Sequence, residues 1–227
     1  MKMADQIDAN PRLLLLLQHF NIDFKVSDLT VSQLCEQYNI SETLFVDIAN
    51  LYNGFGPKKN HTYTKEDLLH VIDFLKNTHH YYRSDMYPQI NNYIHQLQEN
   101  HPEVELELKL IEKFFNEYFT EVKEHLDYED DIAFPYFIEL LQNNSSNDAR
   151  VLYSSKEYSD HHSDIELKLH DLKNLLLKYV HVDNDLDLRR KLFFALYELE
   201  YDLYIHSLIE ESILIPSGVQ IEKKENA

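Results

Sequence analysis

The sequence predicts an all-α protein. Its 227 residues include only three glycines and six prolines, and the good helix formers leucine, glutamate, lysine and glutamine recur throughout. No stretch shows the sustained alternation of β-branched residues that is typical of strands. With 44% hydrophobic and 12% aromatic residues, the chain can form one well-filled core and a smaller appendage. We therefore expect helices packed around one main core.

The segment 1–56 is expected to form a small N-terminal module of three helices. An asparagine–proline pair at 10–11 predicts the start of the first helix. Thr30, with a glutamine three residues later, has the pattern of a capping box for the second helix, and Ser41 is expected to begin the third. The segment 53–60 holds two of the three glycines and predicts a linker.

The segment 57–219 predicts an up-down-up-down bundle of four long amphipathic helices. The first expected helix runs from near residue 64 to beyond Pro88, and the second from near 101 to near 129. The third runs from 152 to near 180, and the fourth from near 183 to near 210. Pro88 is expected to kink the first of them, because proline removes an amide donor and crowds the preceding turn. The charged tail, residues 220–227, is expected to fray.

The composition argues against several classes of function. A formal net charge of −19 repels nucleic acid and anionic membrane surfaces, so neither is expected as a partner. The single cysteine, Cys35, excludes an intramolecular disulfide and a cysteine-based zinc site, and we expect it to be a small core residue. The apolar run Leu13–Leu17 is too short for a signal peptide or a membrane span. The expected location is the cytoplasm.

A histidine–glutamate motif occurs twice, as His125 with Glu129 and as His206 with Glu210, each with a proline six residues after the glutamate. Residues four apart lie on one face of a helix, with Cβ atoms roughly 6 Å apart, so each pair can point a nitrogen and a carboxylate into one cavity. A carboxylate can bridge two cations, and imidazoles can serve as terminal ligands. A single copy is usually a solvent-facing hydrogen-bonded pair, but the repetition favours a two-metal site.

A pair of adjacent histidines precedes each motif. The interval from His80 to the first motif is 45 residues, and the interval from His162 to the second is 44. Neighbouring helix positions differ by about 100°, so only one histidine of each pair can face the cavity. The spacing favours His80 over His79 and His162 over His161, and the other member of each pair remains the alternative. His101 has no counterpart in the second repeat and would add an imidazole to one metal only, which would make the two metals inequivalent.

At these residues the chain resembles the hemerythrin-type cation-binding domain. Over nearly its full length it is similar to the repair-of-iron-centres proteins, di-iron proteins linked to restoring iron–sulfur clusters damaged by nitric oxide or peroxide. The resemblance implies two iron ions joined by an oxo bridge, with manganese as the alternative metal, and glutamates that bridge the ions. The ligands that it implies are His80, His101, His125, Glu129, His162, His206 and Glu210. The implied partners are damaged iron–sulfur proteins and the small ligands oxygen and nitric oxide, and a homodimer is left open.

The N-terminal module departs from this family. Where relatives place a Cys-Cys-Gly-Gly stretch, the segment 21–30 has neither cysteine nor glycine. A thiol function is therefore not expected here, and a docking or dimerising module fits better.

The ligand set alone leaves the function open between several alternatives, including whether the protein is an enzyme. The first is support of iron–sulfur cluster repair, by delivering iron or by removing nitric oxide. The second is a sensor or carrier of oxygen or nitric oxide that turns nothing over. An oxidase or peroxidase is disfavoured, because such sites use four carboxylates and only two recur in this chain.

Overall fold

The structure is a computed structural model that describes residues 1–56, 61–142, 165–182 and 184–225. These residues are helical with short connections, and among them there is no strand, only one isolated antiparallel bridge between Lys2 and Thr30. The predicted all-α class is confirmed. Within the same residues, no helix combines the length and the apolar character that a bilayer span needs.

Contacts divide the chain into two compact units. The first unit contains Met1–Thr78, Ala133–His161 and Ile205–Ala227, and the second contains His79–Ile132 and His162–Tyr204. Three of the boundaries fall inside helical segments, namely α5 (Lys65–Tyr81), the π-helix η3 (Glu129–Ala133) and α11 (Leu186–Ile209), so each of these segments contributes residues to both units.

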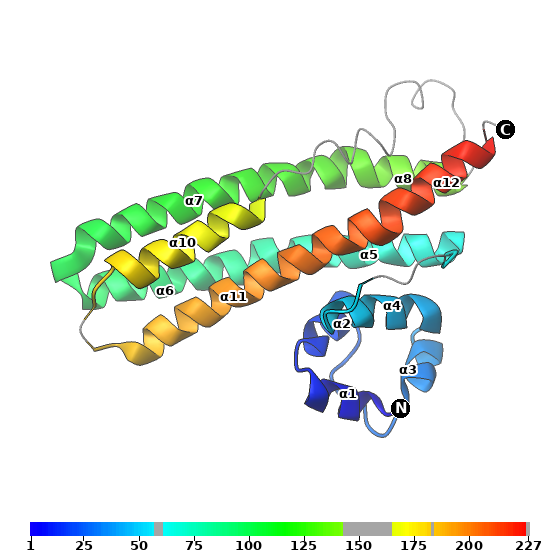
Figure 1. Ribbon diagram of the computed structural model, residues 1–227, viewed down its shortest axis with the longest axis horizontal. Helices are drawn as coiled ribbons and strands as arrows, with labels where there is room; N and C mark the ends of the chain where they lie inside the picture. The colour runs from blue at the N-terminus through cyan, green and yellow to red at the C-terminus, as the bar shows by residue number, and fades with distance from the viewer. Residues whose placement is uncertain (57–60, 143–164, 183, 226–227) are drawn as a thin grey trace. The chain divides into compact units, whose positions relative to one another are not determined.

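The second unit is a bundle of four helices, formed by α6 (Tyr87–Asn100), α7 (Glu105–Tyr128), α10 (Ile165–Tyr179) and the part of α11 up to Tyr204. The helix α7 packs against both α6 and α10 (Figure 1). A single 3-10 turn, η2 (Pro102–Val104), joins α6 to α7, and so short a connection requires the two helices to run antiparallel. The ring of Tyr87 stacks on that of Phe119 with centroids 4.0 Å apart. The predicted helical bundle is confirmed.

The N-terminal module belongs to the first unit. Its helices α2 (Leu13–His19), α3 (Val31–Gln37) and α4 (Glu42–Tyr52) agree with the three predicted helices, and the capping box at Thr30 is present. A further helix, α1 (Met3–Ala9), is additional to the prediction. No side chain caps its start, so the sequence carries no local signal for it, and burial of Met3 stabilises it instead.

Two helices far apart in the sequence, α8 (Phe134–Gln142) and α12 (Ile215–Glu225), lie side by side in the first unit (Figure 1). The hydroxyl of Tyr136 donates a hydrogen bond to Glu222 Oε1 over 2.6 Å. The segment from residue 220, which is expected to fray, is helical as far as Glu225 and makes this contact with α8.

In the part of the chain that the structure describes, three π-helical segments interrupt the long helices. They are η1 (Tyr82–Met86), η3 (Glu129–Ala133) and η4 (Glu210–Leu214). Each ends two residues before a proline, at Pro88, Pro135 and Pro216. A proline lacks the amide hydrogen and its ring clashes with the carbonyl four residues earlier, and a wider turn moves that carbonyl away. The kink predicted at Pro88 takes this form, and both motif glutamates are first residues of a π segment.

Candidate metal centre

Glu129 is the central residue of a polar cluster in the second unit. Its side chain is fully buried, and it follows the last residue of α7. Its Oε1 lies 2.9 Å from Nε2 of His125, one helical turn earlier. Its Oε2 lies 3.1 Å from Nε2 of His79, near the end of α5. We call these three residues the Glu129 half-site.

The other ring nitrogen of His79 is fixed by a carboxylate. Nδ1 lies 2.9 Å from Asp130 Oδ1, and Arg83 contacts both Asp130, at 3.0 Å, and Asp127, at 2.8 Å. An ionised carboxylate can only accept a hydrogen bond, so Nδ1 of His79 carries the hydrogen. In the neutral imidazole, Nε2 then presents its lone pair to Glu129.

Asp130 is held in its ionised form. Burial raises the pKa of its carboxyl group, but the interactions with His79 and Arg83 outweigh burial and hold this pKa below its ordinary value. Asp130 is therefore a charged acceptor for the hydrogen of His79 at neutral pH.

A second pair of motif residues, His206 and Glu210, lies in the first unit and is also buried. Nε2 of His206, in the last turn of α11, is 3.3 Å from Oε1 of Glu210, the first residue of η4. Nδ1 of His206 is 2.7 Å from the hydroxyl oxygen of Thr78, which donates its own hydrogen to the carbonyl of Leu75 over 2.7 Å. Because that single hydrogen is used, the hydroxyl accepts from Nδ1, and Nε2 presents its lone pair to the carboxylate. We call His206 and Glu210 the Glu210 half-site.

The chemistry of both half-sites fits a transition-metal ion. In each, an imidazole lone pair faces a carboxylate oxygen in a place that is closed to solvent, and two such acceptors attract one another only through a proton or a metal cation between them. Calcium and magnesium prefer oxygen ligands alone, whereas mixed imidazole and carboxylate ligands suit iron, manganese and zinc.

Both predicted pairs of histidine and glutamate are thus brought together, but two other predicted ligands are not. His80, the predicted ligand, is exposed and contacts Ser84 over 3.3 Å. Its neighbour His79 takes the buried position instead. The reason is the π segment η1, which puts one extra residue between the histidines and Pro88 and shifts the inward-facing position by one.

His101 lies at the opposite end of the second unit from Glu129. The 24 residues of α7 separate them, which is about 36 Å at the 1.5 Å rise per residue of a helix. Its ring nitrogens contact Glu103 at 2.9 Å and Asp185 at 3.2 Å. The predicted histidine His162 and its alternative, His161, lie outside the described residues.

Sequence reasoning missed the two side chains that hold the outer nitrogens, Asp130 and Thr78. Each directly adjoins a residue already singled out, since Asp130 follows Glu129 and Thr78 precedes the histidine pair. A search for acceptors next to candidate ligands could have found both.

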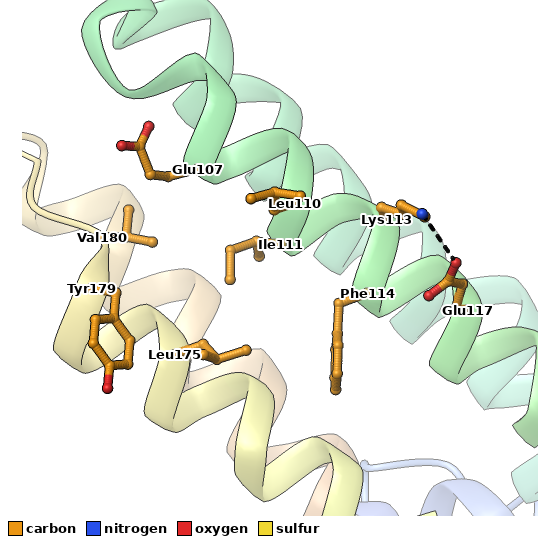
Figure 2. Close-up of a pocket in the computed structure, with 9 residues that line it drawn as sticks. All are labelled: Glu107, Leu110, Ile111, Lys113, Phe114, Glu117, Leu175, Tyr179 and Val180. Carbon is orange, nitrogen blue, oxygen red and sulfur yellow. Dashed lines mark ion pairs between the residues drawn. The ribbon is translucent and has the colours of Figure 1, made fainter.

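A separate hollow of about 400 Å³ lies between α7 and α10 in the second unit (Figure 2). Its walls are mainly apolar, and Phe114 and Leu175 point into it from the two helices, with the ion pair between Lys113 and Glu117 on one side. None of the half-site residues lines this hollow, so it has no part in the candidate metal centre.

Comparison with known families gives a match over most of the chain. The model of the family described as hemerythrin HHE cation binding domain matches residues 70–217, nearly two thirds of the sequence. This range includes both half-sites. Comparisons with curated proteins and with solved structures give no match.

Proposed function

Because the chain belongs to the hemerythrin HHE cation-binding family, we propose that it is a di-iron protein that supports the repair of iron–sulfur clusters damaged by nitrosative or oxidative stress. In this proposal the two half-sites form one centre. Its core is His79, Glu129 and His206, three buried groups of a composition that can hold a metal ion. His125 and Glu210 complete the ligand set.

Continuity of α5 supports the union of the half-sites. Thr78 and His79 are consecutive residues of this helix, and they contact His206 and Glu129 respectively. One helix therefore orients an imidazole of each half-site, either directly or through a hydrogen bond.

The observation that carries the proposal is the assignment of the imidazole hydrogens. Asp130 and Thr78 fix the hydrogens of His79 and His206 on Nδ1, which leaves both Nε2 atoms to bind metal. Iron bound by such nitrogens and carboxylates can take up small diatomic ligands and exchange single electrons.

Burial favours nitric oxide removal over iron delivery as the way to support repair. Both glutamates are fully buried, and of the three histidines that face them His79 and His206 are 1% and 3% exposed, while the side chain of His125 is 15% exposed. A hydrated cation leaves such a place only when the helices separate, whereas nitric oxide is small and uncharged. The link to iron–sulfur clusters rests on the resemblance of the repeated motifs. Two of the ligands that this resemblance implies, His80 and His101, lie away from the half-sites.

The same burial favours a second candidate, a sensor or carrier that binds oxygen or nitric oxide without turnover. A closed site with imidazole ligands and two carboxylates can bind a diatomic molecule and release it unchanged. This candidate predicts a reversible change in visible absorption when oxygen is added to the reduced protein, with no oxygen consumed.

Metal analysis of protein purified without oxygen is the first test, and the expected result is two iron ions per chain. The second test adds the iron-loaded protein to a cluster enzyme inactivated by nitric oxide and follows the recovery of activity and the formation of nitrous oxide. The double variant Glu129→Ala/Glu210→Ala should fail in both tests, and the exposed Glu211→Ala is the matched control. Absence of iron, or equal recovery with the double variant, would overturn the proposal.

A further inference from the structure

The two half-sites differ in the group that holds the outer nitrogen of their buried histidine. Nδ1 of His79 donates to a carboxylate, whereas Nδ1 of His206 donates to a hydroxyl. From this difference we infer that the Glu129 half-site binds its cation more tightly than the Glu210 half-site, so that the two ions enter in separate steps. The inference rests on the proposed two-ion centre.

A carboxylate partner makes an imidazole a stronger metal ligand than a neutral partner does. The negative charge at Nδ1 increases the electron density that Nε2 offers, and loss of such an outer partner typically costs roughly 10–100-fold in metal affinity. The hydroxyl of Thr78 fixes the hydrogen of His206 but brings no charge, and it already donates to the carbonyl of Leu75. Thr78 therefore orients the His206 ring without strengthening the bond between Nε2 and a metal ion.

The charge behind His79 is held in place by its own partners. Arg83 bridges Asp130 and Asp127 with contacts of 3.0 and 2.8 Å, so one positive charge is shared between two carboxylates. The group of three keeps a net negative charge beside the His79 ring. Its residues come from η1, α7 and η3, so it also joins the segment that follows His79 to the segments that carry His125 and Glu129.

The difference in outer partner also decides which form of the protein is populated. A protein with one ion, at Glu129, is then the main species over a range of iron concentrations. The two-ion form, which the proposed function requires, then needs a higher concentration of ferrous iron than the one-ion form.

Calorimetric titration of the metal-free full chain with ferrous ion, without oxygen, tests this inference. We expect two steps whose affinities differ at least about tenfold. Asp130→Asn keeps the shape of the side chain and removes its charge, and it should weaken the tighter step by about 10–100-fold while leaving the weaker step unchanged. Asp130→Glu restores the charge and should recover part of that loss. Thr78→Val should weaken only the second step.

A second measurement uses the unmodified protein, in case a variant fails to fold. An excess of a ferrous chelator should remove the two ions in two phases, the first leaving one ion per chain. Equal affinities in the titration, a single phase of iron loss, or an effect of Asp130→Asn on the weaker step would overturn the inference. Failure to bind two ions at all would instead overturn the proposed function.

Discussion

Replacement of His79 by alanine tests the centre most directly, because its neighbour supplies a matched control. His79→Ala and His80→Ala remove the same side chain from adjacent positions of α5, but His79 is 1% exposed and His80 lies on the surface. Any general effect of losing a histidine from this helix is common to both variants. A difference between them reports the contacts of His79 with Asp130 and Glu129.

The magnitude follows from those contacts. A hydrogen bond to a charged group contributes about 1.5–3 kcal/mol, and removal of the ring leaves a cavity beside two carboxylates, so we expect the free energy of unfolding of the metal-free protein to fall by about 2–4 kcal/mol. In a chain of this size each kcal/mol corresponds to roughly 2–4 °C, so the Tm should fall by roughly 5–15 °C. His80→Ala should change the free energy of unfolding by no more than about 0.5 kcal/mol.

The assay has two parts. Thermal unfolding of both metal-free variants, followed by circular dichroism, gives the stability difference, and iron analysis after anaerobic reconstitution gives the number of ions per chain. His79→Ala should retain fewer ions than the wild type, and His80→Ala should retain all of them. Equal Tm values for the two variants, or loss of iron in His80→Ala alone, would show that the histidine facing Glu129 has been misassigned.

Three further predictions concern single side chains. Thr78→Val should lower the free energy of unfolding by about 1–3 kcal/mol in urea, because His206 loses its acceptor in a buried place, whereas Thr120→Val, which loses a similar bond to a helix carbonyl at the surface, should change it by less than about 0.5 kcal/mol. Burial raises the pKa of Cys35 to about 12, so alkylation by iodoacetamide at pH 8 should be slow in the folded protein and fast in denaturant; rapid labelling of the folded chain would contradict its place in the core. Hydrogen bonds from Gln98 and His95 hold the pKa of the Glu112 carboxyl below its ordinary value of 4.5. The ionised carboxylate therefore stabilises the fold above pH 4.5, and this contribution is lost as the pH falls through the lower pKa of the folded state. Glu112→Gln should therefore flatten the fall in stability below about pH 4.5, and an unchanged pH profile would count against this.

Local periodicity allowed the helices and both motif pairs to be predicted from the sequence. The pairs of His125 with Glu129 and of His206 with Glu210 lie within one helical turn, so their proximity depends only on the chain being helical there. The choice between His79 and His80 depended instead on counting across a turn that is not α-helical. A π segment adds a residue to that turn, and the sequence shows only the proline that causes it.

The position of His101 could not be predicted for a different reason. The resemblance implied His101 as a ligand, but the length of α7 separates it from Glu129, and a match of sequence motifs does not show where the chain reverses direction between helices. The 3-10 turn at Pro102 ends the preceding helix at the far end of the bundle. Where two proposed ligands flank a whole long helix, that helix itself argues against a shared site.

The difference in outer partner between the two half-sites comes from the register of α5. Consecutive residues of a helix point about 100° apart, so Thr78 and His79 necessarily meet different neighbours. One of them supplies a hydroxyl to His206, and the other supplies its own imidazole to Glu129, with Asp130 behind it. A perfect duplication of the motif would give both half-sites the same outer partner. Because a single helix serves both, the duplicated motifs keep the same arrangement of imidazole and carboxylate while the groups that tune their imidazoles differ.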